Sequence, residues 1–502
     1  MRDKDVRSAV DQLDISQIER DYEEFTKEVM NEYYQNWAGL KDELNVSQIF
    51  QKHNELFTPE SMAIVRKGIG ALSGDELRRL ERLLGSLVDT YLARQVAELT
   101  DKAVTLETQT NVNIDGKPVP YRSTLSMVMN EDNRKRRGTI HSIAETAVAT
   151  FNPILEERMT KLHEVAKEQG YLDYASLYSK IRNIDYDKLA NELRTYIAST
   201  DSLYLKQLES VLKSIGVELR DAERHDILYF YRGKRFDAYF PKSGAVTALQ
   251  KTLDGMDLRL EKYPNITLDL EERPKKDPRA ACFPLDVPKK VILGTMPLGG
   301  RYDYETVLHE AGHALHAANT PAELPFVFRL SDEKSLTETY SALFENLTLN
   351  ERWLRQIVGI DNPKELLDFT FFSKLYITRL YTAKLDYELR LHREGIQGKS
   401  QLYTELHERA IKVPLNPVNY LINVDDGFYC AEYLRSWVAE AQLRKYLIEE
   451  FGEEWFANPS SGRLLKELWE EGSRITVEEL AEKLEQTLSC KFLYDEIRQH
   501  FE

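Results

Sequence analysis

Two histidines four residues apart, with a glutamate beside the first, form the segment His309-Glu310-Ala311-Gly312-His313. On an α-helix, positions i and i+4 share one face, so His309 and His313 can bind the same metal ion. Glu310 points about 100° round from His309, which lets it act on an attacking water without ligating the metal. This HExxH pattern predicts a zinc site for hydrolysis.

The residues around the motif predict a buried helix over about 304–318. Asp303 is expected to cap its first turn. Gly312 within the helix costs about 1 kcal/mol relative to alanine, so we expect another backbone or side chain to pack closely there. Apolar residues recur at helical spacing: Val307, Leu308, Ala311, Ala314, Leu315 and Ala318.

A catalytic zinc site needs a third protein ligand, and the following segment offers several carboxylates. They are Glu323, Asp332, Glu333, Glu338 and Glu345. Glu323 lies between two prolines and is a poor rigid ligand. Ser335, three residues before Glu338, predicts the start of a second helix. Glu338 and Glu345 then lie two turns apart on one side, where one can ligate and the other can support a ligand histidine.

The spacing and context of these residues resemble a known family. The chain resembles the thimet oligopeptidase and oligoendopeptidase F family of zinc metallopeptidases (gluzincins). The resemblance lies in the HExxH motif, the 24 residues that follow it, and the segment 338–346, in which Glu338 and Glu345 are the two glutamates. Further similarity lies upstream at 279–283, and weaker similarity occurs at 131–134 and 427–472. The resemblance implies Glu338 as the third ligand, with Glu345 close behind it, and one Zn²⁺ per chain.

The resemblance also implies a fold and a substrate. The expected fold is mainly α, a multi-helix two-lobed metallopeptidase with a small β-sheet beside the active-site helix. Its lobes would enclose a deep substrate channel that admits short peptides and excludes folded proteins. Glu310 would be the general base for hydrolysis of peptide bonds in these oligopeptides.

The chain departs from this family downstream, where the family carries a histidine and two tyrosines. Alignment places Tyr429 at the first tyrosine, Val424 at the histidine and Ser436 at the second tyrosine. Tyr433, one helical turn beyond Tyr429, could replace the missing phenol. We therefore expect Tyr429 and Tyr433 to donate hydrogen bonds to the developing oxyanion.

Arg435 is a candidate substrate-binding residue. Its guanidinium could hold a peptide carboxylate bidentately, and a structural ion pair is the alternative.

Two other functions stay open. The first is a metallocarboxypeptidase resembling the carboxypeptidase Taq family, to which Asp277-Pro278-Arg279 is similar, although that family's His-Glu-Ser-Gln motif is absent. The second is a catalytically silent peptide-binding scaffold, favoured by the missing downstream histidine.

Length and composition set the wider expectations. A chain of 502 residues exceeds one compact core, so we expect a helical N-terminal lobe over 1–220 and a catalytic lobe over 221–502, with the small sheet at about 265–297. A net charge of −16 argues against nucleic acid or an anionic membrane as partner. Short peptides are the expected partners of a monomer or homodimer.

Cysteine use and hydropathy bear on the compartment. Three scattered cysteines are too few for a disulfide framework, and no apolar run approaches 18 residues. The expected location is the cytoplasm.

Overall fold

The computed structural model describes residues 2–70, 72–330 and 333–502, with side chains from residue 14 onward. The chain forms two compact units, each built from three stretches of sequence. Unit 1 contains 1–91, 236–367 and 435–492, and unit 2 contains 92–235, 368–434 and 493–502. These interleaved units do not coincide with the contiguous lobes expected at 1–220 and 221–502, because the chain leaves unit 1 and returns to it twice.

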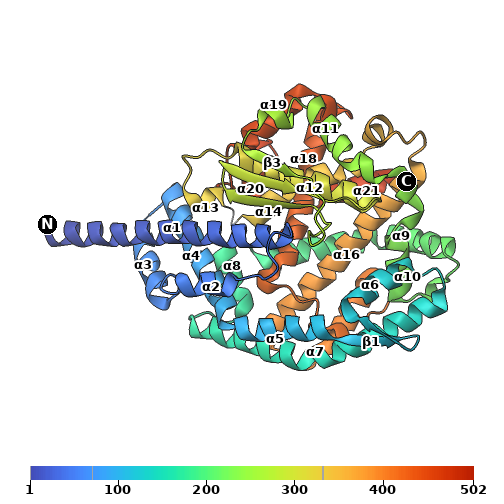
Figure 1. Ribbon diagram of the computed structural model, residues 1–502, viewed down its shortest axis with the longest axis horizontal. Helices are drawn as coiled ribbons and strands as arrows, with labels where there is room; N and C mark the ends of the chain where they lie inside the picture. Colours follow the sequence, from blue (N-terminus) through green and yellow to red (C-terminus); the bar gives the residue numbers. More distant parts are fainter. Residues whose placement is uncertain (1, 71, 331–332) are drawn as a thin grey trace. The chain divides into compact units, whose positions relative to one another are not determined.

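Both units are mainly helical, as expected (Figure 1). The helices lying wholly or mostly in unit 1 are α1 (Arg2–Trp37), α2 (Val46–Lys52), α3 (Pro59–Ile69), α4 (Gly74–Gln95), α11 (Ala245–Gly255), α12 (Arg301–Asn319), α13 (Phe326–Arg329), α14 (Lys334–Glu345), α15 (Glu351–Trp353), α18 (Tyr429–Phe451), α19 (Pro459–Trp469) and α20 (Val477–Lys483). Those of unit 2 are α5 (Ala97–Gln109), α6 (Thr124–Asn130), α7 (Arg134–Glu168), α8 (Tyr174–Arg182), α9 (Tyr186–Ser214), α10 (Arg224–Tyr231), α16 (Lys364–Glu394), α17 (Lys399–Ile411) and α21 (Lys491–Phe501). None of the described helices is both long enough and apolar enough to cross a membrane.

Unit 1 contains a three-stranded sheet immediately before α12, where the sequence predicts one. Its strands are β3 (Ile266–Asp269), β4 (Ala281–Asp286) and β5 (Lys290–Gly294), in the order β3-β5-β4. β5 is parallel to β3 and antiparallel to β4. The apolar residues of β4 and β5 pack against Tyr34 and Trp37 of α1, and α12 also contacts both strands (Figure 1). β4 is therefore an edge strand that runs beside the helix carrying the two histidines.

Helix α12 begins three residues before the predicted start. Its N-cap is Gly300, and Asp303 accepts hydrogen bonds from the backbone N–H groups of Leu298 and Gly299 in the preceding loop. Asp303 therefore secures the entry to the helix instead of capping its first turn. The apolar residues of the predicted face, apart from half-buried Ala318, are buried, which confirms a core helix.

Helix α14 packs directly on α12, and Gly312 lies where the two backbones approach closely. A methyl group there would lie 2.6 Å from Ser341 Cα and 2.7 Å from Tyr340 O. Glycine at this position thus lets the two backbones approach, as the sequence predicts. The capping box predicted for α14 is absent, because the helix begins at Lys334 and Ser335 lies inside it.

Unit 2 contains a two-stranded hairpin that the helical reading of residues 1–220 does not predict. β1 (Asn111–Ile114) pairs antiparallel with β2 (Lys117–Pro120) across Asp115 and Gly116. Both turn residues have positive φ, 53° and 78°, as a type I′ turn requires. The Asp-Gly dipeptide is the signal that identifies such a hairpin in a sequence.

Candidate metal centre

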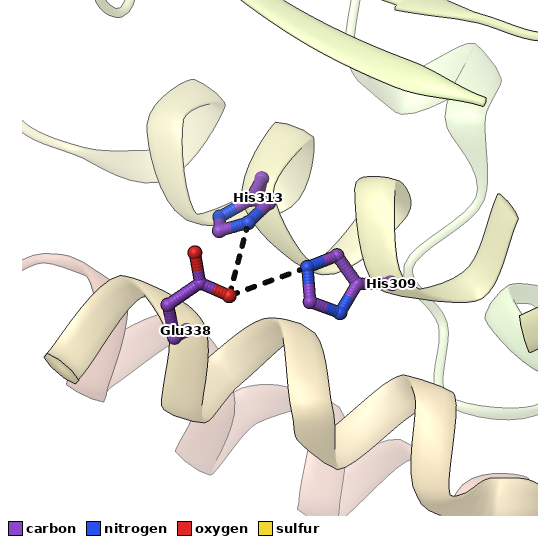
Figure 2. A group of neighbouring side chains, drawn as sticks. All are labelled: His309, His313 and Glu338. Carbon is purple, nitrogen blue, oxygen red and sulfur yellow. Dashed lines mark ion pairs between the residues drawn. The ribbon is translucent and has the colours of Figure 1, made fainter. Parts of the chain in front are cut away.

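Three side chains predicted to bind a metal converge between α12 and α14, as Figure 2 shows. Glu338 Oε2 lies 3.3 Å from His309 Nε2 and 3.8 Å from His313 Nε2. A tetrahedral zinc ion with bonds of about 2.0–2.2 Å separates its ligand atoms by about 3.3–3.6 Å. The separation from His309 falls in this range and the one from His313 is slightly longer, and two imidazoles with one carboxylate are the donor set of a catalytic zinc site.

Glu345 holds the ring of His309 in place from the side opposite Glu338. Its Oε2 lies 2.8 Å from His309 Nδ1. A proton on Nδ1, donated to this carboxylate, leaves Nε2 free to accept a metal. The structure thus brings Glu345 to His309, a predicted ligand, two helical turns from Glu338 as the spacing predicts.

Glu310 is fixed by the edge strand of the sheet. Its Oε2 accepts a hydrogen bond of 2.8 Å from the backbone N–H of Cys282 in β4. Burial raises the pKa of Glu310 to about 7, against the opposing effects of His309 and of the Cys282 N–H. A carboxylate with a pKa near neutrality is well matched to taking up and releasing a proton.

The surroundings of the two histidines favour a cation. Burial lowers the pKa of His313 to about 4, so this imidazole is neutral at neutral pH, the form that binds metals. Burial also opposes a charge on His309, but hydrogen bonds with Glu338 and Glu345 raise its pKa well above the usual value. Glu338 thus places a negative charge between the two imidazoles, and Glu345 adds a second one behind the ring of His309.

The other acidic residues considered as third metal ligands lie outside this cluster. Glu323 is exposed in the loop after α12. Glu333 is buried, with its carboxylate 3.4 Å from Arg435 and 3.5 Å from Arg82. Asp332 lies outside the described residues.

Tyr429 and Tyr433 lie against each other in the first turns of α18. Their ring centroids are 4.8 Å apart, and both side chains are half-buried. Both residues belong to unit 2, whereas the metal cluster belongs to unit 1. Their action as oxyanion donors stays a prediction.

Arg435 lies in unit 1 and is only 4 % exposed. Its guanidinium donates to Ser335 Oγ at 2.8 Å and to Glu478 Oε2 at 2.7 Å. These contacts tie α18 to α14 and α20, which is the structural ion-pair alternative for this residue. A role in substrate binding stays a prediction.

Sequence reasoning did not find the backbone of Cys282 as the anchor of Glu310. Residues 281–286 alternate weakly and contain Pro284, which obscures the pattern of a strand. A backbone N–H also carries no signal in the residue type. Only the pairing of β4 with β5, beside α12, places this donor next to the carboxylate.

Comparisons with known proteins identify the fold. No family model and no curated protein sequence matches the chain. Among solved structures, metallocarboxypeptidase 1 of Trypanosoma cruzi is similar with a TM-score of 0.62 and 13 % identity, over 97 % of this chain and 99 % of that chain. A protein assigned as an oligoendopeptidase F from Bacillus anthracis has a TM-score of 0.61 and 14 % identity, over 95 % of this chain and 94 % of that chain.

A second oligoendopeptidase F structure has a TM-score of 0.70 and 14 % identity, over 98 % of this chain and 95 % of that chain. The chain therefore has, over nearly its whole length, the mainly helical fold found in a metallocarboxypeptidase and in oligoendopeptidases F.

Proposed function

We propose that this protein is a zinc metallopeptidase that hydrolyses peptide bonds in short oligopeptides. The observation that carries the proposal is the convergence of His309, His313 and Glu338 beside a glutamate anchored to an edge strand. The fold, shared with proteins of that kind, is consistent with it. His309, His313 and Glu338 would hold one zinc ion per chain.

The proposed chemistry assigns one task to each residue. A bound zinc ion would polarise the scissile carbonyl and activate water for attack. Glu310 takes the proton from the attacking water and passes it to the leaving amine. Its bond to Cys282 holds the carboxylate in one rotamer, so the transfer needs no reorganisation. Tyr429, with Tyr433, would donate to the oxyanion.

The proposal also covers which peptide bond is cleaved, an internal bond as in an endopeptidase or the last bond as in a carboxypeptidase. We favour an oligoendopeptidase because Glu338 and Glu345 match that family's spacing and context. The likeness to a metallocarboxypeptidase makes carboxypeptidase action the second candidate. The two differ chemically, since a carboxypeptidase requires the free C-terminal carboxylate of its substrate.

The deciding experiment compares the wild type with Glu310→Gln on a peptide pool. The pool contains peptides of about 5 to 20 residues, half with amidated C-termini, and products are identified by mass spectrometry. We expect internal cuts in both halves with the wild type and a loss of at least about 10³-fold in rate with Glu310→Gln, because the general base is gone. Glu323→Gln, which alters an exposed glutamate outside the cluster, should cleave at the wild-type rate.

The metal content of each variant separates the possible outcomes. Glu310→Gln should retain one zinc per chain, measured by mass spectrometry of the metal. Release of single C-terminal residues from the free acids alone would establish carboxypeptidase action. No cleavage by a zinc-loaded wild type would contradict the enzymatic proposal and favour a peptide-binding scaffold.

A further inference from the structure

A cavity of about 440 Å³ lies within unit 2, away from every residue of the metal cluster. Its walls come from α6, α7, α10, α16 and α17 and from the segment that follows α17. This volume lies within the range of small-molecule binding sites.

Arg224, the first residue of α10, lines this cavity. Its Nη1 is buried and has no hydrogen-bond partner in the described part of the chain, and no described carboxylate forms an ion pair with the guanidinium. The ring of Tyr376 lies 5.7 Å from the guanidinium carbon. An arginine stays charged inside proteins, and a buried charge without a counter-charge is costly. A group that accepts hydrogen bonds and carries negative charge would relieve this cost.

The acidic residues near Arg224 in the sequence serve other cations. The carboxylate of Asp226 is fully buried and bonded to Arg134 and Arg137, each at 2.9 Å. Glu223 is exposed, with its carboxylate 4.0 Å from the guanidinium of Arg134. Neither carboxylate neutralises Arg224.

The other charged groups of the cavity wall also have protein partners. Lys384 is 2.7 Å from Asp425. Glu145 accepts hydrogen bonds from Asn416 at 2.9 Å and from Asn419 at 3.3 Å. Among the charged groups of this wall, Arg224 is thus the one whose buried Nη1 has no hydrogen-bond acceptor in the described part of the chain.

The remaining groups around the guanidinium are neutral or apolar. Burial lowers the pKa of His407 to about 4, with Arg224 acting in the same direction, and burial likewise lowers the pKa of His141. Leu228 and Leu380 belong to the apolar part of the wall. A ligand of matching chemistry has one negative group for the guanidinium and an apolar body for the rest of the cavity.

We propose that this cavity binds a carboxylate carried on an apolar body, with Arg224 as its counter-ion. The paired N–H groups of a guanidinium match the two oxygens of a carboxylate. Two sources share this chemistry, the C-terminus of a peptide and a free small acid. The proposal does not depend on the peptidase function, since every residue that carries it lies in unit 2.

The test measures binding in the full-length, metal-loaded chain carrying Glu310→Gln, so that turnover does not interfere. The probes are N-acetyl-leucine and its uncharged analogue N-acetyl-leucinamide, titrated by calorimetry. We expect the acid to bind at least about tenfold more tightly than the amide, and this preference to vanish in Arg224→Gln. Arg220→Gln removes an exposed arginine four residues earlier and should keep the preference. Binding of the acid to zinc would survive Arg224→Gln, so only the Arg224-dependent part counts.

A second variant guards against a folding defect in Arg224→Gln. Leu228→Trp adds bulk to the cavity wall while keeping the guanidinium, and it should also weaken acid binding. Circular dichroism melts verify that both variants are folded. N-acetyl-Ala-Ala-Ala-Leu distinguishes the sources, since binding comparable to that of N-acetyl-leucine indicates a peptide C-terminus and its failure to bind indicates a free acid. Equal binding of acid and amide, or unchanged preference in folded Arg224→Gln, would overturn the proposal.

Discussion

At the scale of single residues, the contact between Glu345 and His309 orients the ring of a proposed ligand histidine. The carboxylate lies 2.8 Å from Nδ1, so it selects the tautomer with Nε2 available to a metal. Glu345 therefore acts through His309 and touches no other ligand atom of the cluster in the described contacts.

This arrangement predicts a graded response to substitution. Glu345→Gln should weaken zinc affinity by about 10- to 100-fold, because an amide orients the His309 ring less strongly than a carboxylate and makes its Nε2 less basic. Glu338→Gln should weaken it further, since a charged ligand is lost. Competition with a fluorescent zinc chelator measures both constants. Equal affinity in Glu345→Gln and the wild type would show that the contact does not serve the metal.

At the scale of elements, the distance between α12 and α14 decides whether the two histidines and Glu338 lie close enough to bind one metal ion. Both histidines come from α12 and the carboxylate from α14, and Gly312 lies where the two helices approach closely. The distance between two helix backbones thus sets the distance between the ligand atoms.

Gly312→Ala tests this coupling. The added methyl group would meet the backbone of Ser341, so we expect a loss of about 1–3 kcal/mol in unfolding free energy and at least tenfold weaker zinc binding. Ala318→Gly is the control, because it destabilises the same helix by about 1 kcal/mol without a clash. Urea unfolding and zinc titration check both variants. A stability loss with unchanged zinc affinity would contradict the coupling.

In unit 2 an ion-pair cluster joins α7 to α10. Asp226 of α10 accepts hydrogen bonds from Arg134 and Arg137 of α7. Burial raises the pKa of Asp226, but the hydrogen bonds with His225 and the two arginines outweigh it and hold the pKa well below the usual range.

Asp226→Asn should therefore destabilise the protein and change its response to acid. We expect a loss of about 3–5 kcal/mol, because Arg137 is left buried without its counter-charge. A depressed folded-state pKa gives stability that is present above the unfolded value of about 4 and lost as pH falls below it. Urea unfolding between pH 7 and pH 3 should show this part of the acid dependence in the wild type and not in Asp226→Asn; parallel curves would refute the assignment.

At the scale of the whole molecule, the units are assembled from interleaved stretches of chain. The sheet of unit 1 is formed by residues 266–294, whereas the helix that covers its apolar face is α1, at the start of the chain. A contiguous half of the sequence therefore lacks part of the core that it needs.

The fragment 221–502 should accordingly fail to fold by itself. It contains the three proposed metal ligands but lacks Tyr34 and Trp37, which pack on Phe283 in the intact chain. We expect poor amide dispersion by NMR and no stoichiometric zinc binding, with recovery when 1–220 is co-expressed. A cooperatively unfolding fragment that binds zinc would show that α1 is dispensable.

The sequence by itself determined the features that depend on short separations. His309 and His313 share a helix face, Gly312 marks a close approach, and Glu338 and Glu345 lie two turns apart, because helix geometry converts spacing directly into position. The helical class follows from apolar residues at helical spacing, and the sheet before α12 follows from alternating or clustered β-branched residues between prolines.

Only the tertiary structure determined the contacts between residues that are far apart in the sequence. The backbone of Cys282 anchors Glu310 because β4 pairs at the sheet edge, and Arg435 is bonded within unit 1 because α18 packs on α14 and α20. Arg224 is left facing a cavity because its acidic neighbours turn to other arginines. Such contacts depend on packing between elements far apart in the chain, for which no local spacing of residue types gives a signal.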